Sequence, residues 1–186
     1  RYYYEWAGLW VIWSYQGINI KEYPSILNHL KNYKSALEKR TGGARRLANG
    51  ELLIPYKWYE LQVDSMAHIS EFEKEKVVWG NISFNSEFCF IDKGIYINAP
   101  ANIVTTQTTS IKYLIGNMNS NLFDWQFKQV GIFLGHAFEW KKQYVEQVRI
   151  PPVTPANQPI VGQIEALVDK ILAAKKENPQ TNTSHW

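Results

Sequence analysis

Apolar residues recur at helical spacing in three parts of the chain. The first part, Pro24–Arg40, starts with a proline that suits the first turn of a helix and ends before two glycines. The second, Ser110–Trp125, starts with a favourable N-cap and carries one apolar stripe. The third is Pro159–Lys176. The spacing therefore predicts three main helices.

Between the first two helices, the pattern changes to one typical of strands. Val77–Phe84 alternates, Phe88–Ile91 and Ile95–Asn98 flank an Asp-Lys-Gly turn signal, and Ala101–Thr106 is rich in β-branched residues. Near the N-terminus, the short apolar run Leu9–Trp13 predicts a buried strand. We therefore expect an α+β fold, in which an antiparallel β meander packs with the three main helices.

The chain length sets the expected domain organisation. With 186 residues, one domain can bury a sizeable core. Prolines between residues 151 and 159 form a stiff connector before the last helix. We expect residues 1–152 to form the body of a single domain, residues 153–176 its C-terminal helix, and residues 177–186 a disordered tail.

Charge adds a local basic field to this picture. The formal net charge is only +3, but the window Lys31–Lys57 holds seven basic and two acidic residues, a local net charge of +5. Such a field attracts a polyanion even when the net charge of the whole chain is small. A solvated helix face with a basic end would give the same composition, so both interpretations stay open. Thr41–Pro55 within this window reads as an irregular loop.

Several kinds of chemistry are missing. The chain has no Gly-rich nucleotide-binding motif and no Gly-x-Ser-x-Gly, and its four histidines do not lie at metal-ligand spacing. The one short nuclease-like motif, Glu139–Lys141, lacks an upstream acidic partner. We therefore expect no catalytic residues, no metal and no cofactor in this sequence.

The same survey indicates a cellular setting. Cys89 is the only cysteine, which suits a reducing cytoplasm and allows no internal disulfide. No apolar run reaches the roughly 20 residues that span a membrane. The sequence begins without Met or a signal peptide, and we expect it to be a fragment of a longer chain.

Basic, amide and aromatic side chains on the predicted loops suit a nucleic-acid ligand. Phosphates are bound by Lys, Arg and backbone N–H groups, whereas base edges are read by Arg, Lys, Asn, Gln or Ser. Asn85 and Gln143 are of the right type. The residues that we expect to bind DNA are Arg45, Arg46, Asn49, Lys57, Trp58, Asn81, Ser83, Trp140, Lys141 and Lys142.

Short motifs in a fixed order connect the chain to a known family. They are Tyr23-Pro24, His29-Leu30, Leu37–Arg40, Lys57–Leu61, Lys76–Trp79, Gly94–Tyr96, Leu114–Trp125, Phe138–Gln147 and Ile150-Pro151. In this order, over about Arg1–Lys176, the chain resembles the TaqI-like C-terminal specificity domain. That domain is the target recognition domain of type IIG restriction enzymes and related N6-adenine DNA methyltransferases.

The resemblance implies a function and a set of partners. In that family a methyltransferase domain, which binds S-adenosylmethionine and holds a flipped adenine, precedes the specificity domain. Where a nuclease domain is fused, it lies further upstream and needs Mg²⁺. The present chain would then read double-stranded DNA without modifying it, need no cofactor of its own, and have the upstream methyltransferase domain as its partner.

The resemblance leaves some residue roles and other functions open. Trp79 and Trp125 are expected to be scaffold, whereas Trp58 and Trp140, each beside a lysine, suit either scaffold or DNA contact. The loop Thr41–Pro55 is the first place where we expect specificity to be set. The alternatives are a structural or protein-interaction domain of a multi-subunit restriction-modification complex, and a carbohydrate-binding module that uses exposed aromatic rings.

Overall fold

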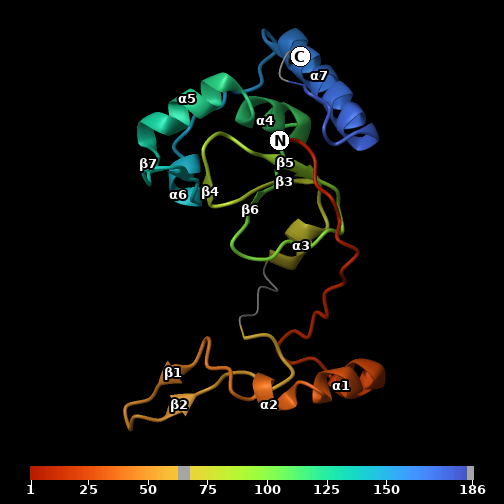
Figure 1. Ribbon diagram of the computed structural model, residues 1–186, viewed down its shortest axis with the longest axis vertical. Helices are drawn as coiled ribbons and strands as arrows, with labels where there is room; N and C mark the ends of the chain where they lie inside the picture. Colours follow the sequence, from red (N-terminus) through yellow and green to blue (C-terminus); the bar gives the residue numbers. More distant parts are fainter. Residues whose placement is uncertain (63–67, 184–186) are drawn as a thin grey trace. The chain divides into compact units, whose positions relative to one another are not determined.

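The computed structural model describes residues 1–62 and 68–183 (Figure 1). The chain divides into two compact units. We call Gly8–Ser70 the hairpin unit, and Arg1–Ala7 together with Glu71–Trp186 the sheet unit. The prediction that residues 1–152 form the body of a single domain and residues 153–176 its C-terminal helix stays a prediction.

The sheet unit contains two small antiparallel sheets. One has the strand order β5-β3-β6, and the other has the order β4-β8-β7. The strands are β3 (Lys76–Trp79), β4 (Ile82–Ser83), β5 (Cys89–Ile91), β6 (Asn102–Val104), β7 (Ile132–Phe133) and β8 (Phe138–Glu139). Because β3 and β4 are separated by only two residues, the alternating segment predicted as one strand supplies a strand to each sheet.

Helices pack beside these sheets (Figure 1). They are α3 (Ile69–Phe72), α4 (Ile111–Met118), α5 (Asn121–Val130), α6 (Lys142–Val145) and α7 (Gln158–Glu177). Ser110 caps α4 as predicted. The predicted helix Ser110–Trp125 is divided into α4 and α5, because Ser120 accepts a hydrogen bond from the Phe123 N–H and starts a new helix.

The core of the sheet unit is built around stacked aromatic rings. Trp140 is only 1% exposed, and its ring lies parallel to that of Phe127, with centroids 3.7 Å apart. Phe88 meets Trp140 edge-on, and Trp79 packs against Phe88. Both indoles donate their N–H: Trp140 Nε1 to the Ser83 carbonyl oxygen at 3.0 Å, and Trp79 Nε1 to the Trp140 carbonyl oxygen at 2.7 Å. These contacts join β3, β4 and β8 to α5.

The long helix α7 packs against α4 through a glycine. A Cβ placed on Gly116 would lie 2.7 Å from Cγ2 of Ile164 and 3.1 Å from Cγ2 of Val168. The two helices can therefore approach this closely only where one of them lacks a side chain. Lys112 adds an ion pair to Asp169 on α7, at 2.6 Å.

The hairpin unit is smaller and holds fewer buried side chains. Its elements are η1 (Ile20–Glu22), α1 (Pro24–Lys31), α2 (Lys34–Leu37), β1 (Arg45–Arg46) and β2 (Leu52–Leu53). The predicted helix Pro24–Arg40 is interrupted between α1 and α2. The segment Thr41–Pro55, expected to be an irregular loop, contains the β1-β2 hairpin instead.

A buried carboxylate ties the hairpin unit together. Glu60 is 3% exposed and accepts backbone N–H bonds from Gly17 at 3.0 Å and from Lys57 at 2.8 Å. Lys57 Nζ lies 3.3 Å from the same carboxylate. Burial alone would raise the pKa of Glu60, but these backbone hydrogen bonds and the lysine charge outweigh it, so its pKa is lowered.

A cation beside Glu60 serves the same part of the fold. The Arg40 guanidinium donates to the Trp58 carbonyl oxygen at 2.7 Å and to the Glu60 carbonyl oxygen at 2.9 Å. It also lies over the Tyr56 ring, 5.4 Å from the centroid. Arg40 therefore connects the end of α2 to the turn before Leu61, and this residue of the basic window has a structural role.

The mixed α+β class, the antiparallel strands and the main helices are confirmed. Two strand predictions are wrong. Leu9–Trp13 forms no strand, and Leu9 to Ile12 are exposed. Ile95–Asn98 forms no hairpin with the preceding strand, because β5 pairs with β3 instead.

Of the predicted tail at residues 177–186, Glu177 ends α7, and residues 184–186 lie outside the described part of the chain.

The aromatic core gives a stability prediction with a matched control. We expect Trp140→Ala to lower the free energy of unfolding by about 3–5 kcal/mol, because it leaves a cavity beside Phe127 and removes the indole hydrogen bond to the Ser83 carbonyl oxygen. Trp125→Ala, whose ring is 62% exposed, should change it by no more than about 0.5 kcal/mol. Urea unfolding followed by far-UV circular dichroism measures both, and equal losses would contradict this core assignment.

Glu60 gives a prediction about pH. Its folded pKa lies below its unfolded value, so the carboxylate stabilises the fold above the unfolded pKa, and this stabilisation is lost as the pH falls through the folded pKa. Wild type should therefore be more stable than Glu60→Gln near pH 6, and the difference should shrink towards pH 3. Urea unfolding at both pH values tests this. Glu38→Gln, a half-exposed carboxylate of the same unit, is the control. A pH-independent difference between wild type and Glu60→Gln would refute the assignment.

Candidate nucleic-acid interface

The β1-β2 hairpin presents two arginines and several leucines to solvent. Arg45 pairs with Leu53 and Arg46 with Leu52, so each arginine shares a face with one leucine of the partner strand. All four residues are exposed. The turn is closed by the Leu47 N–H, which donates to the Glu51 carbonyl oxygen at 2.8 Å. Figure 1 shows the hairpin as a ribbon extending from the helices of its own unit.

The polar side chains of the hairpin differ in how many of their donors and acceptors form hydrogen bonds within the turn. Asn49 donates to the Glu51 carboxylate at 2.9 Å and accepts from the Glu51 N–H at 3.1 Å. Arg46 donates to the Gly50 carbonyl oxygen at 3.1 Å through one nitrogen, Nη1. Within the described residues, the Arg45 guanidinium makes no hydrogen bond. Asn49 therefore shapes the turn, while most donors of the two arginines remain available.

The net charge of the chain lies in this unit. The hairpin unit contains eight basic and five acidic residues, and its net charge of +3 equals that of the whole chain. The sheet unit has twelve of each and is neutral. A polyanion is therefore attracted mainly to the hairpin unit.

Lys57 and Trp58 follow β2 in the chain and contact other side chains of the hairpin unit. Hydrogen bonding to Tyr59 and then to Glu60 raises the pKa of Lys57, whose side chain is 60% exposed. Trp58 is half-buried, with Lys34 Nζ 5.6 Å from its ring centroid and Tyr59 edge-on to it. Lys57 can reach a phosphate, whereas one face of the Trp58 ring is covered by Lys34.

In the sheet unit, Trp140 serves as the anchor of its neighbours. Its buried ring is closed to a ligand, but its backbone N–H donates to the Asn81 carbonyl oxygen at 2.7 Å. Ser83 accepts from the Trp140 indole through its carbonyl oxygen and donates its hydroxyl to the Asn85 carbonyl oxygen. The two open interpretations of Trp140 therefore resolve to scaffold in this structure.

Beside Trp140, a shallow hollow brings together six polar side chains. We call it the amide hollow. Asn102 Nδ2 donates to Asn81 Oδ1 at 2.7 Å, and the two lysines at its edge are paired, Lys141 with Glu139 at 2.7 Å and Lys142 with Glu146 at 3.2 Å. The hydrogen bond from Glu139 is the largest cause that raises the pKa of Lys141. The hollow is lined by Asn81, Asn102, Lys141, Lys142, Gln143 and Glu146.

The predicted site residues thus form two groups of five, one in each unit. Arg45, Arg46 and Asn49 share the hairpin, and Asn81, Lys141 and Lys142 share the amide hollow. Asn102 and Glu146 line the hollow but are not among the predicted site residues: no motif contains Asn102, and Glu146 lies inside the motif Phe138–Gln147 without a signal for binding. The expectation that Trp125 is scaffold is wrong, because that ring is exposed on α5.

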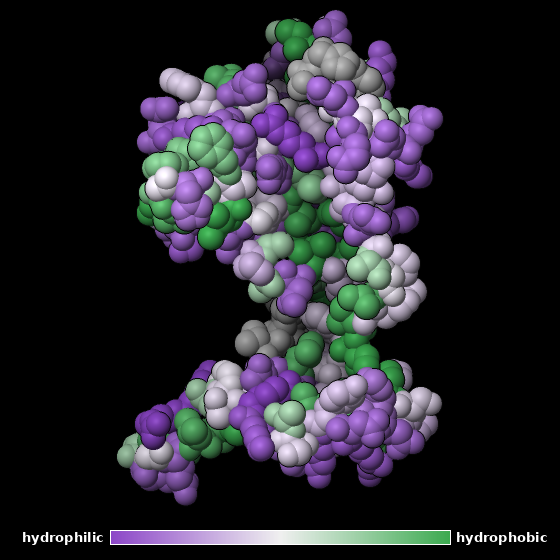
Figure 2. Space-filling model, in the orientation of Figure 1, coloured by the Kyte–Doolittle hydropathy of each residue, from purple (hydrophilic) through white to green (hydrophobic). Residues whose placement is uncertain are grey.

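The sheet unit also exposes an apolar patch. It consists of Ile82, Ile132, Phe133 and Leu134, all exposed on or next to the β4-β8-β7 sheet. Ile82 and Ile132 both lie opposite Glu139 on β8. Figure 2 shows apolar side chains gathered at this end of the unit, near α5 and β7. Exposed apolar side chains gathered in one part of a unit suit a protein contact.

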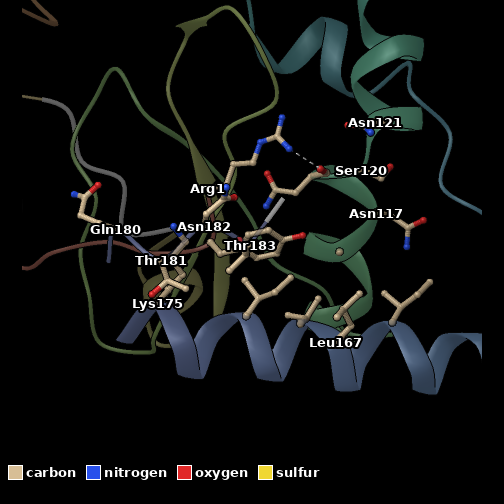
Figure 3. A pocket seen from close by; sticks show the side chains of 16 residues that line it. Arg1, Asn117, Ser120, Asn121, Leu167, Lys175, Gln180, Thr181, Asn182 and Thr183 are labelled. Atoms are coloured by element: carbon tan, nitrogen blue, oxygen red, sulfur yellow. Dashed lines mark hydrogen bonds between the residues drawn. The ribbon is translucent and has the colours of Figure 1, made fainter. Parts of the chain in front are cut away.

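A larger hollow of about 800 Å³ lies between α4, α7 and the first residues of the chain (Figure 3). Arg1 donates to the Asn119 carbonyl oxygen at 3.3 Å at its edge, and Asn117, Leu167 and Lys175 line it. It contains none of the predicted site residues. We therefore separate it from the candidate interface.

Two negative findings apply to the described residues. No three His, Cys, Asp or Glu side chains there are grouped so that they could hold a metal ion. None of the helices in that part of the chain has the length and apolar character needed to cross a membrane.

Comparison with known protein families identifies one family. The family model of the TaqI-like C-terminal specificity domain matches residues 13–151, which is most of the chain. A search of curated proteins gives no match. A specificity domain recognises DNA sequence in a restriction-modification enzyme and is not itself catalytic. The chain therefore belongs to the family of TaqI-like C-terminal specificity domains.

Proposed function

We propose that this chain is the target recognition domain of a type IIG restriction-modification enzyme and binds a specific sequence in double-stranded DNA. The observation that carries the proposal is the exposed β1-β2 hairpin, which presents Arg45 and Arg46 from the unit that holds the net positive charge. DNA carries about one negative charge per 1.7 Å of helix axis, so such a unit is attracted to it.

The hairpin suits the dimensions of DNA. The major groove is about 12 Å wide and admits a two-stranded β-ribbon. An arginine on such a ribbon can bind the O6 and N7 atoms of guanine with two hydrogen bonds, or it can bind a phosphate.

The parent enzyme is proposed to supply the chemistry. It would be a cytoplasmic, S-adenosylmethionine-dependent N6-adenine methyltransferase that flips the target adenine, because the N6 atom cannot be reached inside the base stack. A fused endonuclease would require Mg²⁺. The present chain would fix the register of the duplex while the upstream domain acts on the base.

The apolar patch supports a protein partner. Ile82, Ile132 and Phe133 are exposed on one small sheet, and an upstream methyltransferase domain would cover such a surface. The same observation favours the second candidate, a protein-interaction domain of a multi-subunit restriction-modification complex. Binding to DNA distinguishes the two, because the second requires no DNA contact from this chain. The remaining alternative, a carbohydrate-binding module, is distinguished by how affinity depends on salt concentration, because the affinity of aromatic rings for sugars hardly changes with salt.

The test compares two double variants with equal loss of charge. Arg45→Ala with Arg46→Ala should weaken duplex binding more than Lys175→Ala with Lys176→Ala, because only the first pair lies on the hairpin. For each lost phosphate contact, the slope of log affinity against log salt should become shallower by about 0.9. Fluorescence anisotropy with a labelled duplex at several salt concentrations measures both quantities.

The lysine pair is a strict control because it removes the same charge from the end of α7. Equal losses for the two pairs would show that the hairpin is not the binding face. If wild type shows no duplex binding at low salt, the DNA-recognition proposal for this chain fails.

A further inference from the structure

We infer that the amide hollow is a base-reading site, in which Asn81, Asn102 and Gln143 contact base edges while the hairpin unit grips phosphates. The inference rests on the proposed function and deepens it. It assigns Asn102 and Gln143 as specificity-determining residues and sets them apart from the arginines that give affinity.

The chemistry of the hollow favours bases over phosphates. Three of its six side chains are amides, which offer a donor and an acceptor side by side. Its two lysines are held by carboxylates, Lys141 by Glu139 and Lys142 by Glu146. These pairs cancel the local positive charge, so a phosphate gains little there. Binding by the hollow must therefore depend on hydrogen-bond pattern, which varies with base sequence.

The hydrogen bond between the two asparagines orients both amides. Asn102 Nδ2 donates to Asn81 Oδ1 at 2.7 Å, which leaves the Asn102 oxygen and the Asn81 amino group for a ligand. Both residues are half-buried, so their side chains are restricted without being closed off. An amide bonds with two contacts to adenine, whose N7 accepts and whose N6 donates in the major groove. The expected ligand is thus a base pair that presents an acceptor next to a donor.

The position of the hollow in the fold makes it rigid. Asn102 starts β6 and lies opposite Trp79 in the β3-β6 pair. Asn81 follows β3 by two residues and is held by the backbone N–H of the buried Trp140. Gln143 lies on α6, which begins two residues after Trp140. A base-reading site needs side chains held close to one geometry, and three elements anchored in one core provide this.

The inference thereby assigns the two contributions to DNA binding to different units. Net charge lies in the hairpin unit, and the hydrogen-bond pattern lies in the sheet unit. The hairpin unit carries the whole net charge, and the sheet unit is neutral. Changes in the hollow should alter which sequence is preferred without altering the salt dependence. Changes to the hairpin arginines should alter the salt dependence for every sequence.

The experiment selects duplexes from a randomised pool and sequences the bound DNA. Wild type is compared with Asn102→Ala and Gln143→Ala, and then each protein is titrated with the enriched duplex and its single-base variants. The matched controls are Asn98→Ala and Gln163→Ala, which each remove an exposed amide that does not line the hollow. Unfolding temperatures verify that each variant folds. The exposed side chain of Gln143 keeps the test valid if Asn102→Ala is unstable.

Each hollow variant should lose roughly 5- to 150-fold of discrimination at one base pair, with an unchanged salt slope. Both controls should select the wild-type motif. An unchanged motif and unchanged discrimination in the two hollow variants would overturn this inference alone. Salt-dependent binding of wild type without any enriched motif would also overturn it, while leaving phosphate binding by the hairpin in place. An absence of wild-type binding at any salt would overturn the proposed function as well.

Discussion

The structure of the sheet unit depends on the burial of Trp140. Its ring stacks on Phe127 at 3.7 Å, and its backbone and indole groups form hydrogen bonds to Asn81, Ser83 and Trp79. A buried indole needs a partner for its N–H, and here each partner lies on or next to a different strand. The same residue therefore fills the core and fixes the distance between the two small sheets, whose strands are only two to four residues long.

This arrangement places different demands on the two groups of candidate residues. The amide hollow lies on the core formed by Trp140, whereas the β1-β2 hairpin contains no buried residue. Phosphate contacts tolerate a range of geometries because the Coulomb attraction of an arginine falls off gradually with distance. Hydrogen bonds to base edges do not, because they weaken steeply once the angle departs from linear. The rigid part of the fold is therefore the better position for reading bases.

Local patterns predicted much of the fold. The apolar stripes located α1, α4 and α7, and the cap at Ser110 marked the start of α4. The run Leu9–Trp13 misled, because an apolar composition does not by itself ensure burial, and Leu9 to Ile12 are exposed. Trp125 and Trp140 show the same difficulty: both lie in aromatic segments, yet one is exposed and the other buried. Only long-range packing distinguishes them.

The amide hollow could not be predicted from sequence for a related reason. Asn81 and Asn102 are 21 residues apart, and only the β3-β6 register brings their side chains to hydrogen-bonding distance. Specificity is a difference between affinities for two sequences, and a phosphate contact contributes equally to both. A protein that placed its charge in the hollow would strengthen binding to every sequence and gain no discrimination. A chain with a neutral sheet unit and a basic hairpin unit avoids this, because each contribution can change without changing the other.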